Sequence, residues 1–326
     1  MTKAIIIRNN GDSSQLRIED VPIGDPAPQQ IQVKQLALGI NDIDINFRKG
    51  IYDAKLPFIP GIEASGIVLK VGRDIKNISE GEKVAYVTGP IGSYRTLRNI
   101  DFKDVISIPD DLDLVVVAGF LYKAMMAQTL IRRAHIVLPD TWLLVHDVTG
   151  PYGNLIAQWA DGIKAYVIGT VDHVKKVPIA KKFGCKYVIN LAENNWLDKI
   201  MEITQGKGVP VVFDNLGQAV YEQSIKSLGL FGTYVSYGQK TGFIPPVDIR
   251  LLSKKSLLVT RPNMKHYKRN RVELIRGTQE VFDALNDRLI QPIIGKIYNG
   301  LEEVSLAHDG YESSKLIGSA VVKLPE

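Results

Sequence analysis

Cysteine is almost absent from this chain, since Cys185 is the single one among 326 residues. One cysteine excludes an intramolecular disulfide framework and a Cys-rich zinc site, and it is typical of a protein kept in the reducing cytoplasm. Long apolar runs are also missing. The longest, residues 114–122, is too short to cross a bilayer, and Arg8 ends the N-terminal apolar run before a signal-peptide core forms. We therefore expect a cytoplasmic protein without a membrane partner.

Histidines are few and widely separated. The chain has five, at positions 135, 146, 173, 266 and 308, and none belongs to an H-x-x-H or Cys/His cluster. We therefore expect no metal site. Without a Lewis acid, a carbonyl group has to be polarised by hydrogen-bond donors, for which Asn41, Asp44 and Tyr52 are candidates. The alternative is a capped helix start, because Asn and Asp are common capping residues.

Acidic residues are slightly outnumbered, and 40 Lys and Arg against 35 Asp and Glu give a net charge of +5. This balance suits anionic small molecules and weakly suggests nucleic acid, but it specifies neither. Apolar residues make up 45% and charged residues 23% of the chain, the profile of a soluble globular protein. The length predicts about two domains.

Two patterns follow one another along the chain. Residues 1–110 contain short β-rich runs separated by proline and glycine, which predicts a partly open β-barrel. From about residue 124, apolar strands alternate with helices, which predicts a doubly wound parallel sheet and an α/β fold. A strand-like run at 319–324 indicates that the chain returns to its first domain. The expected strands are 142–148, 165–171, 187–190, 209–214 and 232–238, and expected helices between them include 154–161, 195–204 and 220–228.

The sharpest motif is the segment 145–155, VHDVTGPYGNL, at a predicted strand–turn–helix junction. Against the dinucleotide pattern G-x-G-x-x-G, Val148 replaces the first glycine, whereas Gly150 and Gly153 supply the second and third. The helix N-terminus offers N–H groups to phosphates, although Pro151 lacks one. An ordinary strand-to-helix turn uses glycine in the same way, but the surrounding βαβαβ pattern favours dinucleotide binding.

The end of the second strand in that pattern determines which dinucleotide binds. Asp172 follows Gly150 by 22 residues, where an acidic residue binds a ribose 2′-OH and selects NAD. Lys176 and its neighbours His173 and Lys175 could instead hold a 2′-phosphate. Asp172 could also be only a helix N-cap. The residues alone leave NADH and NADPH both open.

Together these residues resemble the quinone oxidoreductase (zeta-crystallin) branch of the zinc-free medium-chain dehydrogenase/reductase superfamily, over essentially the whole chain. Ile62, before Glu63, stands where zinc-dependent relatives have a histidine ligand. The resemblance implies a GroES-like β-barrel catalytic domain of residues 1–123 and 263–326, a Rossmann nucleotide-binding domain of residues 124–262, and a homodimer. Its landmarks are the segments 39–52, 60–68, 81–84, 150–153, 169–171, 213–217, 236–239 and 257–262.

The resemblance also implies a function and a set of site residues. It implies an NADPH-dependent oxidoreductase that reduces a small quinone, enone or related conjugated carbonyl, with NADH as the alternative cofactor. Asn41 and Tyr52 are similar to substrate-pocket residues and are the predicted catalytic pair. The predicted cofactor contacts are Gly150, Pro151, Tyr152, Gly153, Asp172, Lys176, Tyr237, Gly238, Gln239 and Arg261.

A rival function rests on the basic segment 265–276, KHYKRNRVELIR. Lys268, Arg269 and Arg271 beside Tyr267 could contact phosphates and stack a base, as in a nucleotide-binding protein that binds RNA and has little catalysis. The alternative is a solvated charged loop, because exposed Lys and Arg are common. Nucleic acid is therefore not the expected partner.

Overall fold

The computed structural model of the chain describes residues 1–313 and 315–325. They form two compact units, each assembled from separate stretches of chain. Unit 1 consists of Met1–Tyr122, Lys268–Thr278 and the chain from Pro292 onward, and unit 2 consists of Lys123–Tyr267 and Gln279–Gln291. The expected domain limits, after residues 123 and 262, stay a prediction.

Unit 2 contains the doubly wound sheet that the sequence predicts. Its six strands follow the order β10–β9–β8–β11–β12–β13, and every neighbouring pair is parallel. In chain order this is 3-2-1-4-5-6, the Rossmann order, which reverses between β8 and β11 and places a ligand outside the carboxyl ends of these two strands. The strands are β8 (Trp142–Val145), β9 (Tyr166–Val171), β10 (Cys185–Asn190), β11 (Val209–Asp214), β12 (Leu228–Ser236) and β13 (Leu258–Thr260).

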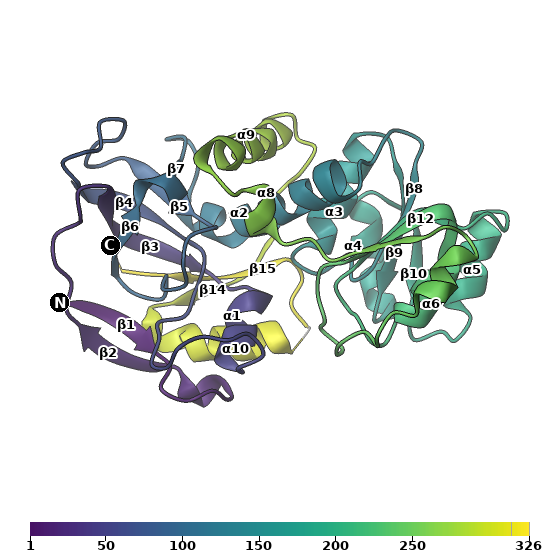
Figure 1. Ribbon diagram of the computed structural model, residues 1–326, viewed down its shortest axis with the longest axis horizontal. Helices are drawn as coiled ribbons and strands as arrows, with labels where there is room; N and C mark the ends of the chain where they lie inside the picture. The colour runs from purple at the N-terminus through teal and green to yellow at the C-terminus, as the bar shows by residue number, and fades with distance from the viewer. Residues whose placement is uncertain (314, 326) are drawn as a thin grey trace. The chain divides into compact units, whose positions relative to one another are not determined.

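Helices cover the sheet of unit 2, which explains why its strands read as nearly continuous apolar runs. Leu144, Ile168 and Val212 belong to one core together with Trp196 of α5 and Tyr221 of α6. Helices α5 and α6 lie side by side in Figure 1. The helices that lie wholly within this unit are α3 (Gly153–Gly162), α4 (Val177–Lys182), α5 (Trp196–Ile203), α6 (Tyr221–Ser227), α7 (Ile249–Ser253) and α8 (Met264–Tyr267).

One helix is longer than the apolar run on which the sequence reading relied. Helix α2 (Leu114–Thr129) continues as a π-helical segment, η3 (Leu130–Ala134), and the 21 residues are long and apolar enough to cross a membrane by length and composition. The expectation that no segment reaches this length is therefore wrong, because the helix continues beyond the run that ends at Tyr122. Its most apolar window is 83% buried inside the protein, as in a core helix.

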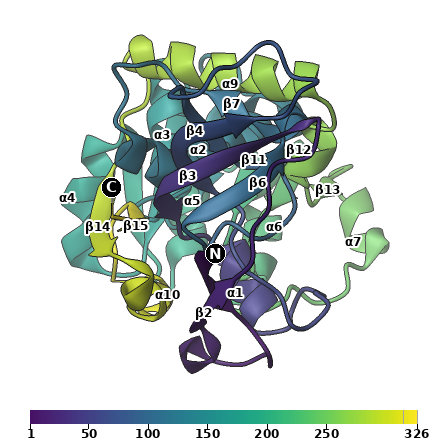
Figure 2. The ribbon, with the colours of Figure 1, turned by 90° about the vertical axis from the view of Figure 1, so that its left-hand side faces the viewer.

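Unit 1 contains a seven-stranded sheet in the order β14–β15–β3–β4–β5–β7, with β6 paired to β3. Figure 2 shows β3 between β4 and β6. Within residues 1–313 and 315–325 no pairing joins β14 to β7, so the sheet does not close into a barrel. Its strands are β3 (Gln30–Gly39), β4 (Ala64–Val71), β5 (Lys83–Tyr86), β6 (Leu97–Asp101), β7 (Ile106–Ser107), β14 (Ile294–Asn299) and β15 (Ser319–Lys323), and β1 (Thr2–Ile6) pairs separately with β2 (Arg17–Val21).

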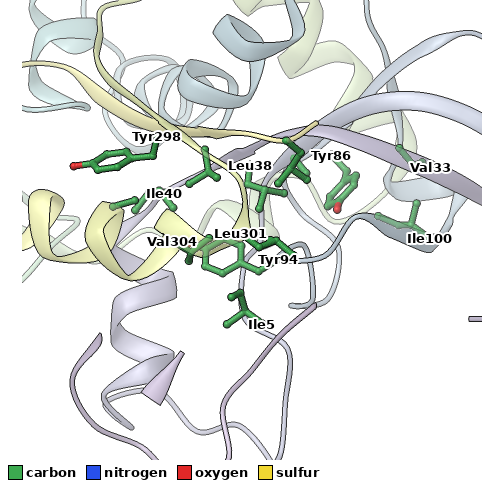
Figure 3. Close-up of a cluster of buried hydrophobic side chains, with 14 of the residues drawn as sticks. Ile5, Val33, Leu38, Ile40, Tyr86, Tyr94, Ile100, Tyr298, Leu301 and Val304 are labelled. Atoms are coloured by element: carbon green, nitrogen blue, oxygen red, sulfur yellow. The ribbon is translucent and has the colours of Figure 1, made fainter. Parts of the chain in front are cut away.

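The core of unit 1 lies between its sheet and the C-terminal helix α10 (Val304–Glu312). Figure 3 shows Leu38 of β3, and Ile40 just after this strand, close to Val304 and Leu301. Helix α1 (Asp42–Arg48) follows β3 and ends before Gly50, whose φ of 72° is a left-handed conformation that favours glycine. Helix α9 covers Arg271–Asn286, and short 3-10 turns occupy Ser13–Gln15, Phe102–Asp104, Val174–Lys176 and Leu301–Glu303.

Candidate functional site

The turn between β8 and α3 has glycine at two positions where a side chain would be crowded, against backbone at Gly153 and against a side chain at Gly150. A Cβ on Gly153 would lie 2.2 Å from the backbone oxygen of Asp147 and 2.8 Å from the Cα of Val148. A Cβ on Gly150 would lie 2.5 Å from Oδ2 of Asp147. Close loop–helix packing at Gly153 is what a dinucleotide-binding loop needs, whereas the carboxylate of Asp147 lies in front of Gly150.

The N-terminus of α3 is suited to an anion. Tyr152 is the N-cap residue, and its side chain makes no capping hydrogen bond to this end of the helix. Asn154 donates its N–H and Nδ2 to the backbone oxygen of Gly150, at 3.3 and 2.6 Å, which fixes the turn. Although Pro151 contributes no N–H, the other groups of the first turn and the helix dipole favour a phosphate here.

A second loop, residues 236–239, lies beside the end of β11. The N–H of Tyr237 donates to the backbone oxygen of Asp214 at 2.8 Å. A Cβ on Gly238 would lie 2.5 Å from the backbone oxygen of Asn215. The ring of Tyr237 meets that of Tyr152 edge to face, with centroids 6.1 Å apart. The structure therefore brings the predicted residues of the two loops together at the switch point of the sheet.

Arg261 holds this second loop in place. Its Nη1 donates to Oγ of Ser236 at 2.9 Å and to the backbone oxygen of Gly238 at 3.2 Å, and its Nη2 donates to Oε1 of Gln239 at 2.7 Å. The resemblance implies a cofactor contact at Arg261. The hydrogen bonds show a residue that positions Gly238 and Gln239.

Three buried polar atoms around these loops have no hydrogen-bond partner among the residues that the structure describes: Oγ1 of Thr149, Oδ1 of Asn215 and Nε2 of Gln239. Buried polar atoms are nearly always paired in folded proteins, so such a group calls for a ligand or a water. Thr149 and Asn215 were not singled out from the sequence, and Asn215 lies within the landmark 213–217. The two loops therefore fit a polar dinucleotide.

The end of β9 carries Asp172 and Lys176 as an ion pair. Nζ of Lys176 lies 2.8 Å from Oδ1 and 3.0 Å from Oδ2 of Asp172. The side chain of Asp172 is 57% exposed, whereas that of Lys176 is 14% exposed. The two residues that favour opposite cofactors thus bind each other. A 2′-phosphate has to compete with the Asp172 carboxylate for this lysine.

We expect Asp172→Ser to shift the cofactor preference toward NADPH. The substitution removes a negative charge from the place of a 2′-phosphate and releases Lys176, so the ratio of NADH to NADPH dissociation constants should rise roughly fivefold or more at low salt. Separate fluorescence titrations of the two cofactors measure this ratio. Glu19→Gln, which breaks the exposed ion pair of Arg8 and Glu19 in unit 1, is the control and should leave the ratio unchanged. An unchanged ratio in Asp172→Ser contradicts the prediction.

Asn41 is fixed at the start of α1 in unit 1. It is fully buried, and its N–H donates to Oδ2 of Asp44 at 3.0 Å, as expected of a helix cap. Its Nδ2 donates to Oε2 of Glu63 at 3.0 Å, and Oε1 of Glu63 accepts from the N–H of Tyr122 at 2.7 Å. Glu63 therefore connects the loop before α1 to helix α2.

Tyr52, the second predicted catalytic residue, is half-buried and packs its ring edge to face on Phe47, with centroids 5.7 Å apart. The sequence reading did not select Tyr122 as a site residue. Burial, followed by the charges of Asp44 and Glu63, raises the pKa of Tyr122, and Tyr52 contributes in the same direction. Tyr122 therefore stays a neutral phenol near the predicted pair.

A chain of buried hydrogen bonds runs from Arg48 to Asp44. Nη1 of Arg48 lies 3.1 Å from Nδ1 of His308, and Nε2 of His308 lies 3.0 Å from the hydroxyl of Tyr94, which donates to Oδ2 of Asp44 at 3.2 Å. Because arginine can only donate, Nδ1 of His308 accepts and its Nε2–H donates. His308 is therefore neutral, and its burial and then Arg48 lower its pKa to about 3.

This neutral histidine predicts a loss of stability in acid. The pKa of His308 lies below the ordinary value of 6.5, so between pH 6.5 and about 3 the unfolded chain binds a proton that the folded protein does not. The free energy of unfolding should fall as the pH decreases, by up to about 1.4 kcal/mol per pH unit from this group. Urea unfolding at pH 7, 6 and 5 gives the free energy of unfolding at each pH, and this free energy should change less with pH in His308→Gln than in the wild type. Part of the pH dependence should remain in the variant, because the pKa of buried His146 is also lowered. An equal pH dependence in the two proteins would contradict a neutral, buried His308.

The basic segment 265–276 is not a loop along its whole length. It includes most of α8, a turn at residues 268–270, and the beginning of α9 at Arg271. Lys268 is only 5% exposed, and Arg271 donates to the backbone oxygens of Phe102 and Val105, both at 2.7 Å, with its guanidinium 4.1 Å from the centre of the Phe102 ring. Two of the three cations that suggested RNA binding are therefore used inside the protein. The prediction of a charged loop at residues 265–276 is therefore corrected to a mainly helical segment. These contacts do not support the RNA alternative.

The described residues contain no group of three or more His, Cys, Asp or Glu side chains placed to hold a metal ion. Cys185 is buried, and burial, followed by the charge of Asp161, raises the pKa of its thiol to about 12. The thiol therefore stays protonated at neutral pH and is neither a ready nucleophile nor a ready metal ligand.

Comparisons with known proteins agree with this architecture. Residues 27–110 match the alcohol dehydrogenase GroES-like domain, and residues 151–283 match the zinc-binding dehydrogenase family. The chain is 33% identical to a 2-haloacrylate reductase of Burkholderia sp over 334 residues, covering 100% of both chains. It is 33% identical to quinone oxidoreductase 1 of Escherichia coli (strain K12) over 325 residues, covering 99% of both. The structure of Escherichia coli quinone oxidoreductase complexed with NADPH superposes with a TM-score of 0.95 at 33% identity, covering 99% of this chain and 100% of that one.

Proposed function

This chain belongs to the quinone oxidoreductase family of the medium-chain dehydrogenase/reductase superfamily, and on that premise we propose that it is an NADPH-dependent reductase of quinones or related conjugated carbonyls. The observation that carries the proposal is the pair of glycines, Gly150 and Gly153, at the switch point of a Rossmann sheet. Relatives of nearly full length and similar identity are reductases by name, and one of them is complexed with NADPH.

Different parts of unit 2 would hold different parts of the cofactor. We assign the diphosphate to residues 150–153 at the start of α3 and the 2′-phosphate to Lys176, once it leaves Asp172. The nicotinamide end is assigned to residues 237–239, whose position Arg261 fixes. When bound, NADPH supplies a hydride to the substrate.

The chain's own contribution to chemistry is to polarise the substrate. A carbonyl that accepts hydride develops negative charge on oxygen, and hydrogen-bond donors at that oxygen lower the barrier. We assign this task to the hydroxyl of Tyr52 and to the amide of Asn41. Glu63 holds one N–H of that amide, which restricts its orientation and leaves the second hydrogen of Nδ2 as the donor. Tyr122 supplies a neutral phenol beside this pair.

The experiment that tests the function titrates NADPH and NADH separately and then measures turnover with a small panel of quinones and enones. Saturable NADPH binding together with NADPH oxidation that depends on the acceptor is expected. Binding without turnover would make the chain a nucleotide-binding protein without reductase activity. No binding of either cofactor would overturn the proposal.

We expect Tyr52→Phe to lower kcat/KM for quinones by about tenfold or more, because the substitution removes a single hydrogen-bond donor from the developing oxyanion. The Kd for NADPH should not change, since Tyr52 is not assigned to the cofactor. Steady-state assays and NADPH titrations provide both values. Tyr187→Phe, at a tyrosine that is 43% exposed on β10, is the matched control and should retain full activity. Equal kcat/KM in the two variants would remove Tyr52 from the mechanism.

Three further properties belong to the same proposal. The reaction proceeds without zinc, because Ile62 takes the place of the histidine ligand before Glu63. The protein acts in the cytoplasm. It forms a homodimer through β13, the edge strand of the unit 2 sheet, where Leu258 is 62% exposed and Phe231 on neighbouring β12 is 72% exposed. An unpaired edge with apolar side chains favours pairing with a second copy, and the mass of the protein in solution tests this.

A further inference from the structure

An acidic side chain occupies the approach to the phosphate loop. Oδ2 of Asp147 lies 2.5 Å from the place that a Cβ on Gly150 would take. The same oxygen is 3.0 Å from Nζ of Lys240 and 3.3 Å from Nδ2 of Asn215, and the Asp147 side chain is only 12% exposed. The carboxylate thus stands directly in front of the glycine whose missing side chain admits a diphosphate.

A carboxylate in this position opposes the binding of a diphosphate, since both are anions. Pro151 removes a backbone N–H from the same turn, which weakens the loop further. A site with these two features needs a compensating cation. Lys240 is that cation, because its ammonium lies 3.0 Å from the oxygen in front of Gly150.

The backbone of Lys240 is held by hydrogen bonds, and its side chain is partly exposed. Its N–H donates to the backbone oxygen of Asn215 at 3.1 Å, and the next residue, Thr241, donates to that of Leu216 at 2.8 Å. The side chain of Lys240 is 28% exposed. Because the four-carbon stem of lysine is flexible, a rotation of it would bring the ammonium to another anion in front of the same glycine.

Two polar groups at this place point independently to a ligand. Thr149 is 1% exposed and Asn215 is 6% exposed. Oγ1 of Thr149 and Oδ1 of Asn215 have no hydrogen-bond partner among residues 1–313 and 315–325. The Asn215 side chain is located by its bond to Asp147, so its unpaired oxygen lies near the ion pair. Thr149 directly precedes Gly150 in the chain, and its hydroxyl can donate a hydrogen bond to a phosphate oxygen.

We propose that Lys240 binds the diphosphate of the dinucleotide, and that the Asp147 carboxylate competes with that diphosphate for the Lys240 ammonium. The inference deepens the proposed function and rests on it, because it requires a dinucleotide at residues 150–153. Without ligand, the carboxylate neutralises the lysine. When the diphosphate binds, the lysine exchanges one anion for the other, and affinity is set by the difference between the two pairings.

Four proteins test the proposal: the wild type, Lys240→Met, Asp147→Asn and the double variant. NADPH is titrated at low and at high salt, and adenosine 2′-monophosphate, which lacks the diphosphate, is the control ligand. Lys240→Met should raise the Kd for NADPH about tenfold, because a charge-assisted contact is lost. Asp147→Asn should lower it severalfold, because the competitor loses its charge. The effect of Lys240→Met should be larger in the Asp147→Asn background, and both effects should shrink at high salt.

If the ion pair of Asp147 and Lys240 only fixed the loop and did not contact the diphosphate, the variants would behave differently. Breaking the pair from either side would then weaken NADPH binding equally, and the double variant would be no worse than either single one; this result overturns the inference. Lys240→Arg should restore most of the affinity, and Lys207→Met, at an exposed lysine of unit 2, should change nothing. A wild type that binds no NADPH overturns the proposed function as well, whereas a wild type that binds NADPH with variants that bind it equally overturns the inference alone.

Discussion

Gly153→Ala is expected to lower the free energy of unfolding by about 3 kcal/mol and to raise the Kd for NADPH by more than about tenfold. The added Cβ meets backbone atoms, with the oxygen of Asp147 at 2.2 Å and the Cα of Val148 at 2.8 Å. Backbone cannot turn away as a flexible side chain can, so the loop has to separate from α3. The N–H groups at the start of the helix then no longer face the diphosphate. Urea unfolding and fluorescence titration with NADPH measure the two effects.

A second glycine supplies the control. A Cβ on Gly24 meets no atom within 4 Å, and alanine there reduces the conformational freedom of the unfolded chain without creating a clash. Gly24→Ala should therefore keep the wild-type NADPH affinity and at least the wild-type stability. Wild-type binding in Gly153→Ala would show that the loop does not hold the cofactor.

Arg48→Met is expected to destabilise the protein by about 3 kcal/mol or more. The guanidinium of Arg48 is 1% exposed and bonds to three groups: Nε donates to the backbone oxygen of Gly11 at 3.2 Å, Nη1 to His308 at 3.1 Å and Nη2 to Oε2 of Glu312 at 2.6 Å. Methionine fills much of the volume but leaves the Nδ1 of His308 buried without a donor. Glu312 keeps its ion pair with Lys49. The loss of stability therefore comes mainly from His308 and the Gly11 carbonyl, which lose their hydrogen-bond donor.

An exposed arginine in the same unit separates this effect from the loss of any arginine. Arg8 binds Glu19 through two hydrogen bonds, of 3.0 and 2.8 Å, at the surface. Exposed ion pairs contribute little because solvent screens them, so Arg8→Met should leave the free energy of unfolding nearly unchanged. Urea unfolding at pH 7 compares the two variants. Equal destabilisation by Arg48→Met and Arg8→Met would contradict the inference that burial makes the hydrogen bonds of Arg48 more stabilising than those of Arg8.

The sequence predicted the unit 2 sheet well because local composition decides it. Strand β11 occupies Val209–Asp214, as expected, and α5 occupies Trp196–Ile203 where 195–204 was expected. Strands covered on both faces must be apolar throughout, and helices between them must be amphipathic. The glycines 150 and 153 were found for the same reason, since a phosphate loop has a local spacing.

The polar contacts could not be predicted from local patterns. Asp147 and Lys240 are 93 residues apart, and Arg48 and His308 are 260 apart. Only the completed fold brings such pairs together, and charged residues are common enough that a pairing cannot be selected from composition. The basic segment 265–276 shows the opposite error. Its charge favoured an exposed loop, whereas Arg271 finds backbone carbonyls and an aromatic ring in unit 1.

The pairing of β15 with β3 imposes an order on biosynthesis. Val322 of β15 lies opposite Leu38 of β3, so this edge of β3 stays unpaired until residues 319–323 have been translated. The six strands of the other sheet all precede β15 in the chain and can assemble in the meantime. An unpaired edge invites aggregation during that interval. Removal of residues 319–323 would therefore leave this edge of β3 exposed and reduce the soluble yield from cells.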